Sequence, residues 1–109
     1  MKITLTDADK KQYFLEFNRD IVASMEDRGI TLETAVNKPV NTIPLMFFWA
    51  FKMNHPKIRK DVTDEIWNNI PKDGKKAITN KLMEMYSDAS DTLMGEPEDD
   101  SKKVSWEIG

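Results

Sequence analysis

Residues 43–51 read IPLMFFWAF, nine consecutive apolar residues that include three phenylalanines and a tryptophan. Asn41 and Thr42 precede this stretch and Lys52 closes it. A helix that crosses a membrane needs about 20 apolar residues, so this stretch is too short to span a bilayer. As a helix it would turn apolar side chains to every side of its axis, and such a helix has to be surrounded by protein. We therefore expect residues 43–53 to form the central helix of the fold.

The boundaries of this central helix are predicted from its polar neighbours and prolines. Asn41 or Thr42 can cap it, and Pro44 then falls in the first turn, where its missing N–H group costs little. The helix should end before the sequence NHP, because a residue that precedes proline is disfavoured in helical geometry. His55 is then expected as an exposed residue at the helix end, near the terminal carbonyl groups.

The N-terminal residues have the period of a β-hairpin. Apolar and polar residues alternate in KITLT and again in QYFLEF, and the polar sequence DADK between them suits a turn. The residues that should share the buried face are Ile3, Leu5, Tyr13, Leu15 and Phe17.

Four further helices are predicted around the central one. Asn18 can cap a helix that ends near Gly29, and Thr31 can cap a helical turn with Leu32 and Val36 four residues apart. Asp61 and Thr63 are candidate caps for a helix that Pro71 ends, and a last helix precedes Gly95. Apolar residues mark one face of each of these two helices: Ile58, Val62, Ile66 and Ile70 in the first, and Ile78, Leu82, Met85, Ala89 and Leu93 in the second.

The composition predicts one small domain with an acidic tail. The chain has 109 residues, no cysteine and a net charge of −3. Residues 95–109 hold five of the 19 acids and two of the 16 bases, so residues 1–94 are balanced. We expect an α+β domain at residues 1–94, with the hairpin packed on four to five helices, and a disordered tail at residues 95–109. Residues 1–20 lack the pattern of a secretory signal, and the absence of thiols fits a cytoplasmic protein.

No residue pattern predicts catalysis, a cofactor or a metal site. His55 is the only histidine, no serine lies in a nucleophile-elbow pattern, and the glycines are isolated. The sequence EPEDD lacks the spacing of a calcium loop. The basic sequence KMNHPKIRK is followed at once by the acids of DVTDE, which favours a salt-bridged surface over a nucleic-acid site.

Four residues are predicted to contact a protein partner. Met83 and Met94 lie off the main apolar face of the last helix, and Trp67 lies off the apolar face of its own helix. Methionine and tryptophan are frequent at surfaces that accept other chains. Trp106 belongs to an alternating fragment, VSWEI, which is either an unstructured end or an edge strand added to a hairpin in its own or another chain.

The order of these segments resembles a family of small phage and prophage proteins, the phage tail assembly chaperone-like proteins. The likeness rests on the hairpin before FNR, the IPLMFFWAF helix before HPKI, the DEIW helix and the WEI ending. It implies a non-enzymatic helper that binds the tape-measure protein, with tail tube subunits as a second client, and that is absent from the finished virion. The reading from the residues leaves open self-association, a small regulatory adaptor, and a nucleic-acid-binding protein that uses KMNHPKIRK.

Overall fold

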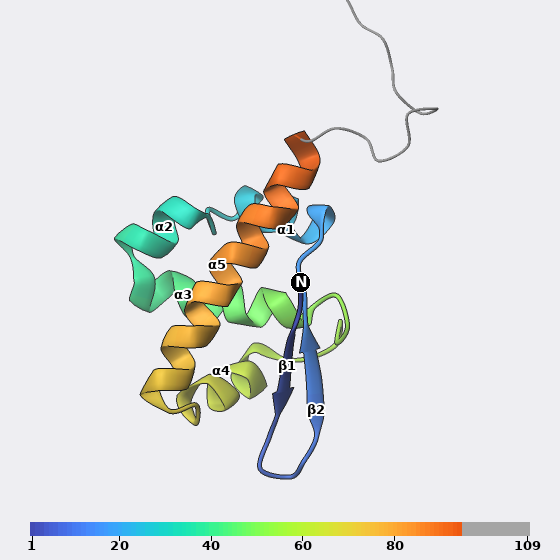
Figure 1. Ribbon diagram of the computed structural model, residues 1–109, viewed down its shortest axis with the longest axis vertical. Coiled ribbons are helices and arrows are strands. Elements are labelled where there is room, and N and C mark those ends of the chain that lie inside the picture. The colour runs from blue at the N-terminus through green and yellow to red at the C-terminus, as the bar shows by residue number, and fades with distance from the viewer. Residues whose placement is uncertain (95–109) are drawn as a thin grey trace, which may run out of the picture.

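The computed structural model describes the backbone of residues 1–94 and the side chains of residues 1–91. In this part, an antiparallel hairpin is followed by five helices (Figure 1). The strands are β1 (Ile3–Thr6) and β2 (Gln12–Leu15), and the helices are α1 (Arg19–Asp27), α2 (Leu32–Asn37), α3 (Pro39–Phe51), α4 (Lys60–Asn68) and α5 (Lys72–Met94). The predicted α+β class and the number of helices are confirmed. The predicted tail at residues 95–109 lies outside the described residues, so the domain boundary stays a prediction.

The hairpin forms as its alternating pattern predicts. Leu5 pairs with Tyr13 and Ile3 with Leu15, so these four side chains share one face, on which Tyr13 and Leu15 are buried. The carboxylate of Asp7 accepts hydrogen bonds from the backbone N–H groups of Asp9 and Lys11, at 3.0 and 2.9 Å, and so holds the turn. The local sequence therefore sets both the register and the turn.

Helices α1 and α2 begin at the predicted caps. The Asn18 side chain accepts the N–H of Ile21 at 2.8 Å, and Thr31 forms a reciprocal capping box with Thr34. Gly29 takes a left-handed φ of 74° after α1, as its predicted position at the helix end requires. Val36 is 67% exposed, and Ala35 is the residue of α2 that is buried.

Helix α3 begins earlier than predicted. Pro39 occupies its first turn after Lys38, so the predicted caps at Asn41 or Thr42 are wrong, and Pro44 lies inside the helix. The reason is that Pro39 already supplies the preorganised first position of a helix. Thr42 is instead buried, and its hydroxyl donates a hydrogen bond to the carbonyl of Thr34 at 3.1 Å.

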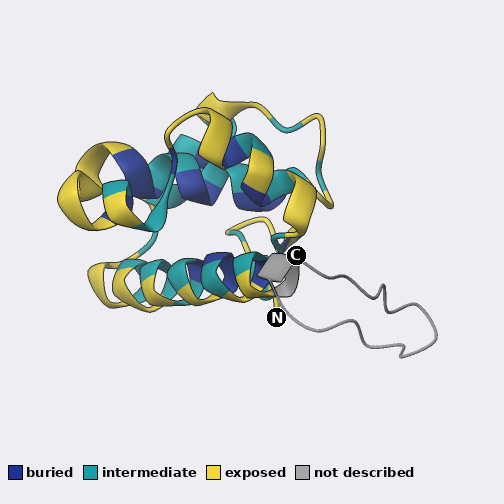
Figure 2. Ribbon diagram, turned by 90° about the horizontal axis from the view of Figure 1, so that it is seen from above, coloured by how far each residue is buried: buried dark blue, intermediate teal, exposed yellow. Residues whose placement is uncertain are grey.

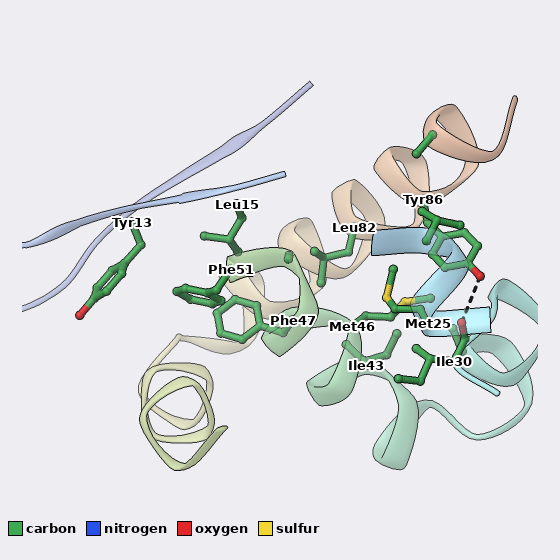
Figure 3. Close-up of a cluster of buried hydrophobic side chains, with 14 residues drawn as sticks. Tyr13, Leu15, Met25, Ile30, Ile43, Met46, Phe47, Phe51, Leu82 and Tyr86 are labelled. Carbon is green, nitrogen blue, oxygen red and sulfur yellow. Dashed lines mark hydrogen bonds between the residues drawn. The ribbon is translucent and has the colours of Figure 1, made fainter. Parts of the chain in front are cut away.

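The core is arranged around α3, which contacts β2 and each of the other four helices (Figure 3). An edge-to-face series of rings runs through it, with centroid distances of 5.5 Å from Tyr13 to Phe51 and 5.0 Å from Phe51 to Phe47. The central role predicted for the helix is confirmed, but it is not surrounded on every side. Phe48 and Trp49 are only partly buried, and the ammonium group of Lys52 lies 4.5 Å from the centroid of the Phe48 ring.

Helices α4 and α5 complete the body. Neither predicted cap of α4 serves as one: Arg59 holds the cap position, and the Thr63 hydroxyl is buried and donates to the Lys60 carbonyl.

Helix α5 begins at Lys72, and its buried positions face the other helices (Figure 2). Leu82, Met85 and Ala89 are buried as predicted, Ile78 is partly buried, and the side chain of Leu93 lies outside the described residues. Tyr86 is buried as well, and its hydroxyl donates to the carbonyl of Ile30 at 3.0 Å. This bond joins α5 to the residue that precedes the Thr31 cap.

Candidate partner-binding groove

Of the four predicted partner residues, the structure describes the side chains of Trp67 and Met83. Trp67 is partly buried, with its ring centroid 4.9 Å from that of Phe47 and the Lys75 ammonium 5.9 Å above it. Met83 is also partly buried and packs on the core from α5. Much of the surface of both side chains is therefore already covered by other residues of the chain. Trp106 and the side chain of Met94 lie outside the described residues.

A groove of about 520 Å³ separates the hairpin from α4. The hairpin extends past α4, with its turn away from the helical body (Figure 1). Side chains from both elements therefore face each other across a space that they do not fill. The groove is lined, among others, by Leu5, Asp7, Asp9 and Tyr13 from the hairpin, and by Val62, Glu65, Ile66 and Ile70 from α4 and the residues after it.

The floor of the groove is apolar and only partly buried. Val62, Ile66 and Ile70 are spaced four residues apart, as predicted for one face of the helix, and Leu5 lies opposite them on β1. None of these side chains is fully buried in the chain alone, in contrast to Leu82 on α5. The groove therefore offers apolar surface that a bound segment would remove from water.

Among the described side chains, 1–91, the charged groups that line the groove are all acidic. They are Asp7 and Asp9 in the hairpin turn and Glu65 on α4, and no lysine or arginine of this part lines the groove. The Asp7 carboxylate already accepts two backbone N–H groups, so it is fixed in place by the turn. This arrangement suits a bound segment with apolar side chains and neutral or basic neighbours, because an acidic neighbour would be repelled.

The outer edge of β2 is occupied by the end of α3 and the chain segment that follows it. The backbone N–H of Phe14 donates to Nε2 of His55 at 3.1 Å, and the Phe14 carbonyl accepts from the Asn54 side chain at 3.0 Å. Farther along, the N–H of Glu16 donates to the Ala50 carbonyl at 3.0 Å. His55 lies at the end of α3 as predicted, where its backbone N–H donates to the Phe51 carbonyl at 2.7 Å, but the prediction that it is exposed is wrong. It is partly buried, with its ring centroid 5.3 Å from that of Tyr13, because the hairpin folds back onto the end of α3.

The basic sequence around residue 57 is partly neutralised by its acidic neighbours. Arg59 contacts Asp61 at 3.1 Å, and Lys60 contacts Asp64 at 2.8 Å. These exposed pairs contribute little to stability. They agree with the predicted salt-bridged surface.

The described residues, 1–94, contain no group of three histidine or acidic side chains placed to hold a metal ion. No helix among them is both long and apolar enough to cross a membrane. The groove was not predicted from the sequence. The four-residue spacing on α4 was its only signal, and the same spacing on α5 belongs to the core.

Comparison with known proteins places the chain in one family. The family model described as a domain of unknown function, DUF5055, matches residues 1–109. No curated protein matches the chain. No solved structure matches it.

Proposed function

This chain belongs to the DUF5055 family of domains of unknown function, and we propose that it is a non-enzymatic assembly chaperone for phage tails. In this proposal it binds the tape-measure protein in the host cytoplasm, with tail tube subunits as a second client, and leaves before the virion is complete. The resemblance of its segment order to tail assembly chaperone-like proteins suggests the client. The groove between the hairpin and α4 is the observation that carries a role in protein binding.

The groove suits an apolar segment of a long helical client. Its floor is formed by Leu5, Val62, Ile66 and Ile70, which keep part of their surface exposed in the free protein. Side chains at positions i, i+3 or i+4 and i+7 of a client helix would enter this groove together. Fully burying one aliphatic side chain contributes about 1.5–3 kcal/mol, so completing the burial of these residues gives modest affinity for each bound segment. Several copies on one long client would then hold it by avidity.

The acidic residues of the groove predict which client segments bind. Asp7, Asp9 and Glu65 would attract lysine or arginine beside the apolar side chains and repel acidic residues there. Because these acids lie at the surface, the attraction should weaken as salt is added. Apolar tape-measure segments with basic flanks should therefore bind more tightly than acidic ones.

The test is a pull-down of soluble tape-measure segments, followed by titration of the segments that bind. Val62→Asp places a charge on the groove floor at a side chain that is not part of the buried core cluster. It should weaken binding by about tenfold or more, because a bound apolar segment would desolvate the new carboxylate. Val40→Asp is the matched control, since Val40 is 86% exposed and lies outside the groove. No binding by the unaltered protein to a soluble segment, or equal losses in both variants, would reject the proposal.

A further inference from the structure

Strand β1 has an open edge. Because the Phe14 N–H and carbonyl point away from β1, toward Asn54 and His55, the facing pair Thr4–Phe14 is a non-hydrogen-bonded pair of the ladder. The backbone groups of Thr4 and Thr6 therefore point to the other side, away from β2. The sheet of the described residues has only the two strands, so no strand among them pairs with these groups. An open edge of this kind is a template for another strand.

We propose that residues 104–108 of a second copy of this chain add to the open edge of β1 as an antiparallel third strand. These residues, VSWEI, lie outside the described part of the chain, and their apolar and polar side chains alternate with the period of a strand. The proposal concerns self-association and does not depend on the identity of the client proposed above, and in the dimer the added strand and a client would compete for the same groove floor.

The alternation sets the register of this third strand. Opposite residues of a sheet point to the same face, and Leu5 points to the face that lines the groove. Trp106 opposite Leu5 places Val104, Trp106 and Ile108 on the groove side. Ser105 and Glu107 then lie opposite Thr6 and Thr4, and each of these two pairs exchanges two backbone hydrogen bonds. The indole of Trp106 would lie over the apolar floor formed by α4.

Charge selects the antiparallel direction. In this direction Lys102 and Lys103 lie beside the hairpin turn, where Asp7 and Asp9 line the groove and Glu65 faces them. Glu107 lies diagonally across from Lys2 at the other end of β1. A parallel strand would place the two lysines beside Lys2 and the glutamate beside the acidic turn. Like charges at neighbouring positions of adjacent strands destabilise the sheet.

The length of α5 favours a second copy over the same chain. Helix α5 begins directly after Pro71, which lines the groove, and its 23 residues rise about 33 Å from their first to their last Cα. The chain from Met94 to Val104 spans at most about 33–36 Å when fully extended. The antiparallel register places Val104 at the turn end of the groove, so its own tail would have to be almost straight. A second copy removes this restriction, and mutual exchange of the two tails closes a symmetric dimer.

The test measures the molar mass of the full chain by light scattering over a range of concentrations, together with amide hydrogen exchange. We expect a monomer–dimer equilibrium, with exchange at Thr4 and Thr6 slowing as the dimer forms. Thr4→Pro removes an outward N–H group without breaking the hairpin ladder, and Thr4→Val is its matched control. Ser105→Pro and Ser105→Ala form the corresponding pair in the tail. Each proline variant should weaken dimerisation by about tenfold, and the controls should not.

Charge exchange tests the direction of the strand. Glu65→Lys should weaken the dimer, as should the paired change of Lys102 and Lys103 to glutamate, and combining them should restore part of the affinity. Thermal unfolding shows whether Thr4→Pro keeps the fold, and if it does not, Ser105→Pro carries the test. A monomer at every concentration overturns the proposal, whether its Thr4 and Thr6 amides exchange fast or are protected by the chain's own tail. A dimer that persists in Ser105→Pro overturns it as well.

Discussion

The face of α5 that packs on the core and the face of α4 that lines the groove both carry apolar residues at helical spacing, but their surroundings differ. On α5, Leu82 is completely buried. On α4, Val62 and Ile66 are only partly buried, because the groove separates them from the hairpin that they face. The core face has its packing partners within the chain, whereas the groove face has room for partners from outside. Substitutions in the two regions should therefore affect different properties, stability in the first and association in the second.

The largest effect is expected at Phe47, in the centre of the core. Phe47→Ala should lower the free energy of unfolding by about 3–5 kcal/mol, because Phe47 is fully buried and contacts the rings of Phe51 and Trp67. Phe48→Ala is the matched control on the next residue, which is partly exposed. It should lower the free energy of unfolding by clearly less than Phe47→Ala does. Urea unfolding followed by circular dichroism measures both. Equal losses in the two variants would show that α3 has no distinct buried side.

The next effect is expected at Tyr86, whose side chain is only 3% exposed. Tyr86→Phe removes the hydrogen bond to Ile30 and leaves a buried carbonyl without this donor, so the free energy of unfolding should fall by about 1–3 kcal/mol. The same urea titration detects this change. A neutral result would mean that water replaces the hydroxyl at the end of α1.

Tyr86 should also make the protein sensitive to alkali. Burial, and secondarily the negative charge of Glu26, raise the pKa of Tyr86 above its ordinary value of 10.0. The folded state therefore keeps the phenol proton at a pH where the unfolded chain releases it. This contribution to stability is complete below about pH 10 and is lost as the pH rises through the raised pKa. Unfolding free energies measured across this range should fall more steeply for the native protein than for Tyr86→Phe, and parallel curves would contradict the assignment.

A smaller, local effect is expected where the hairpin meets the end of α3. His55→Ala removes the acceptor of the Phe14 N–H and a ring that packs against Tyr13. Hydrogen exchange at Phe14 should become faster by about fivefold, since the lost bond is worth about 1 kcal/mol, while amides in α5 should change little. If the α5 amides were to speed up as much, the hairpin and the helices would be a single cooperative unit.

The smallest effect on stability is expected in the groove itself. Val62→Ser shortens a side chain that is partly exposed and outside the core cluster, so the free energy of unfolding should fall by less than about 1 kcal/mol. Binding of a groove ligand should nevertheless weaken measurably in titration. A loss of stability as large as that of Tyr86→Phe would place Val62 in the core and remove the contrast between the two regions.

Features that depend on near neighbours could be predicted from the order of the residues alone. The two-residue period of the hairpin, the caps at Asn18 and Thr31 and the left-handed Gly29 each involve residues within a few positions, and each was predictable. The start of α3 was misplaced although its signal is also local, because Pro39 competes with Pro44 for the first turn.

The packing partners of each element depend on contacts between segments that are far apart in the chain. The Tyr86 hydroxyl donates a hydrogen bond to the carbonyl of Ile30, which lies 56 positions away in the chain. The Phe14 N–H donates to His55, which lies 41 positions away. Spacing along a helix tells which side chains share a face. Whether another element covers that face depends on where the rest of the chain packs. For this reason Leu82 is buried in the core while Val62, at the same spacing in its own helix, lines a groove.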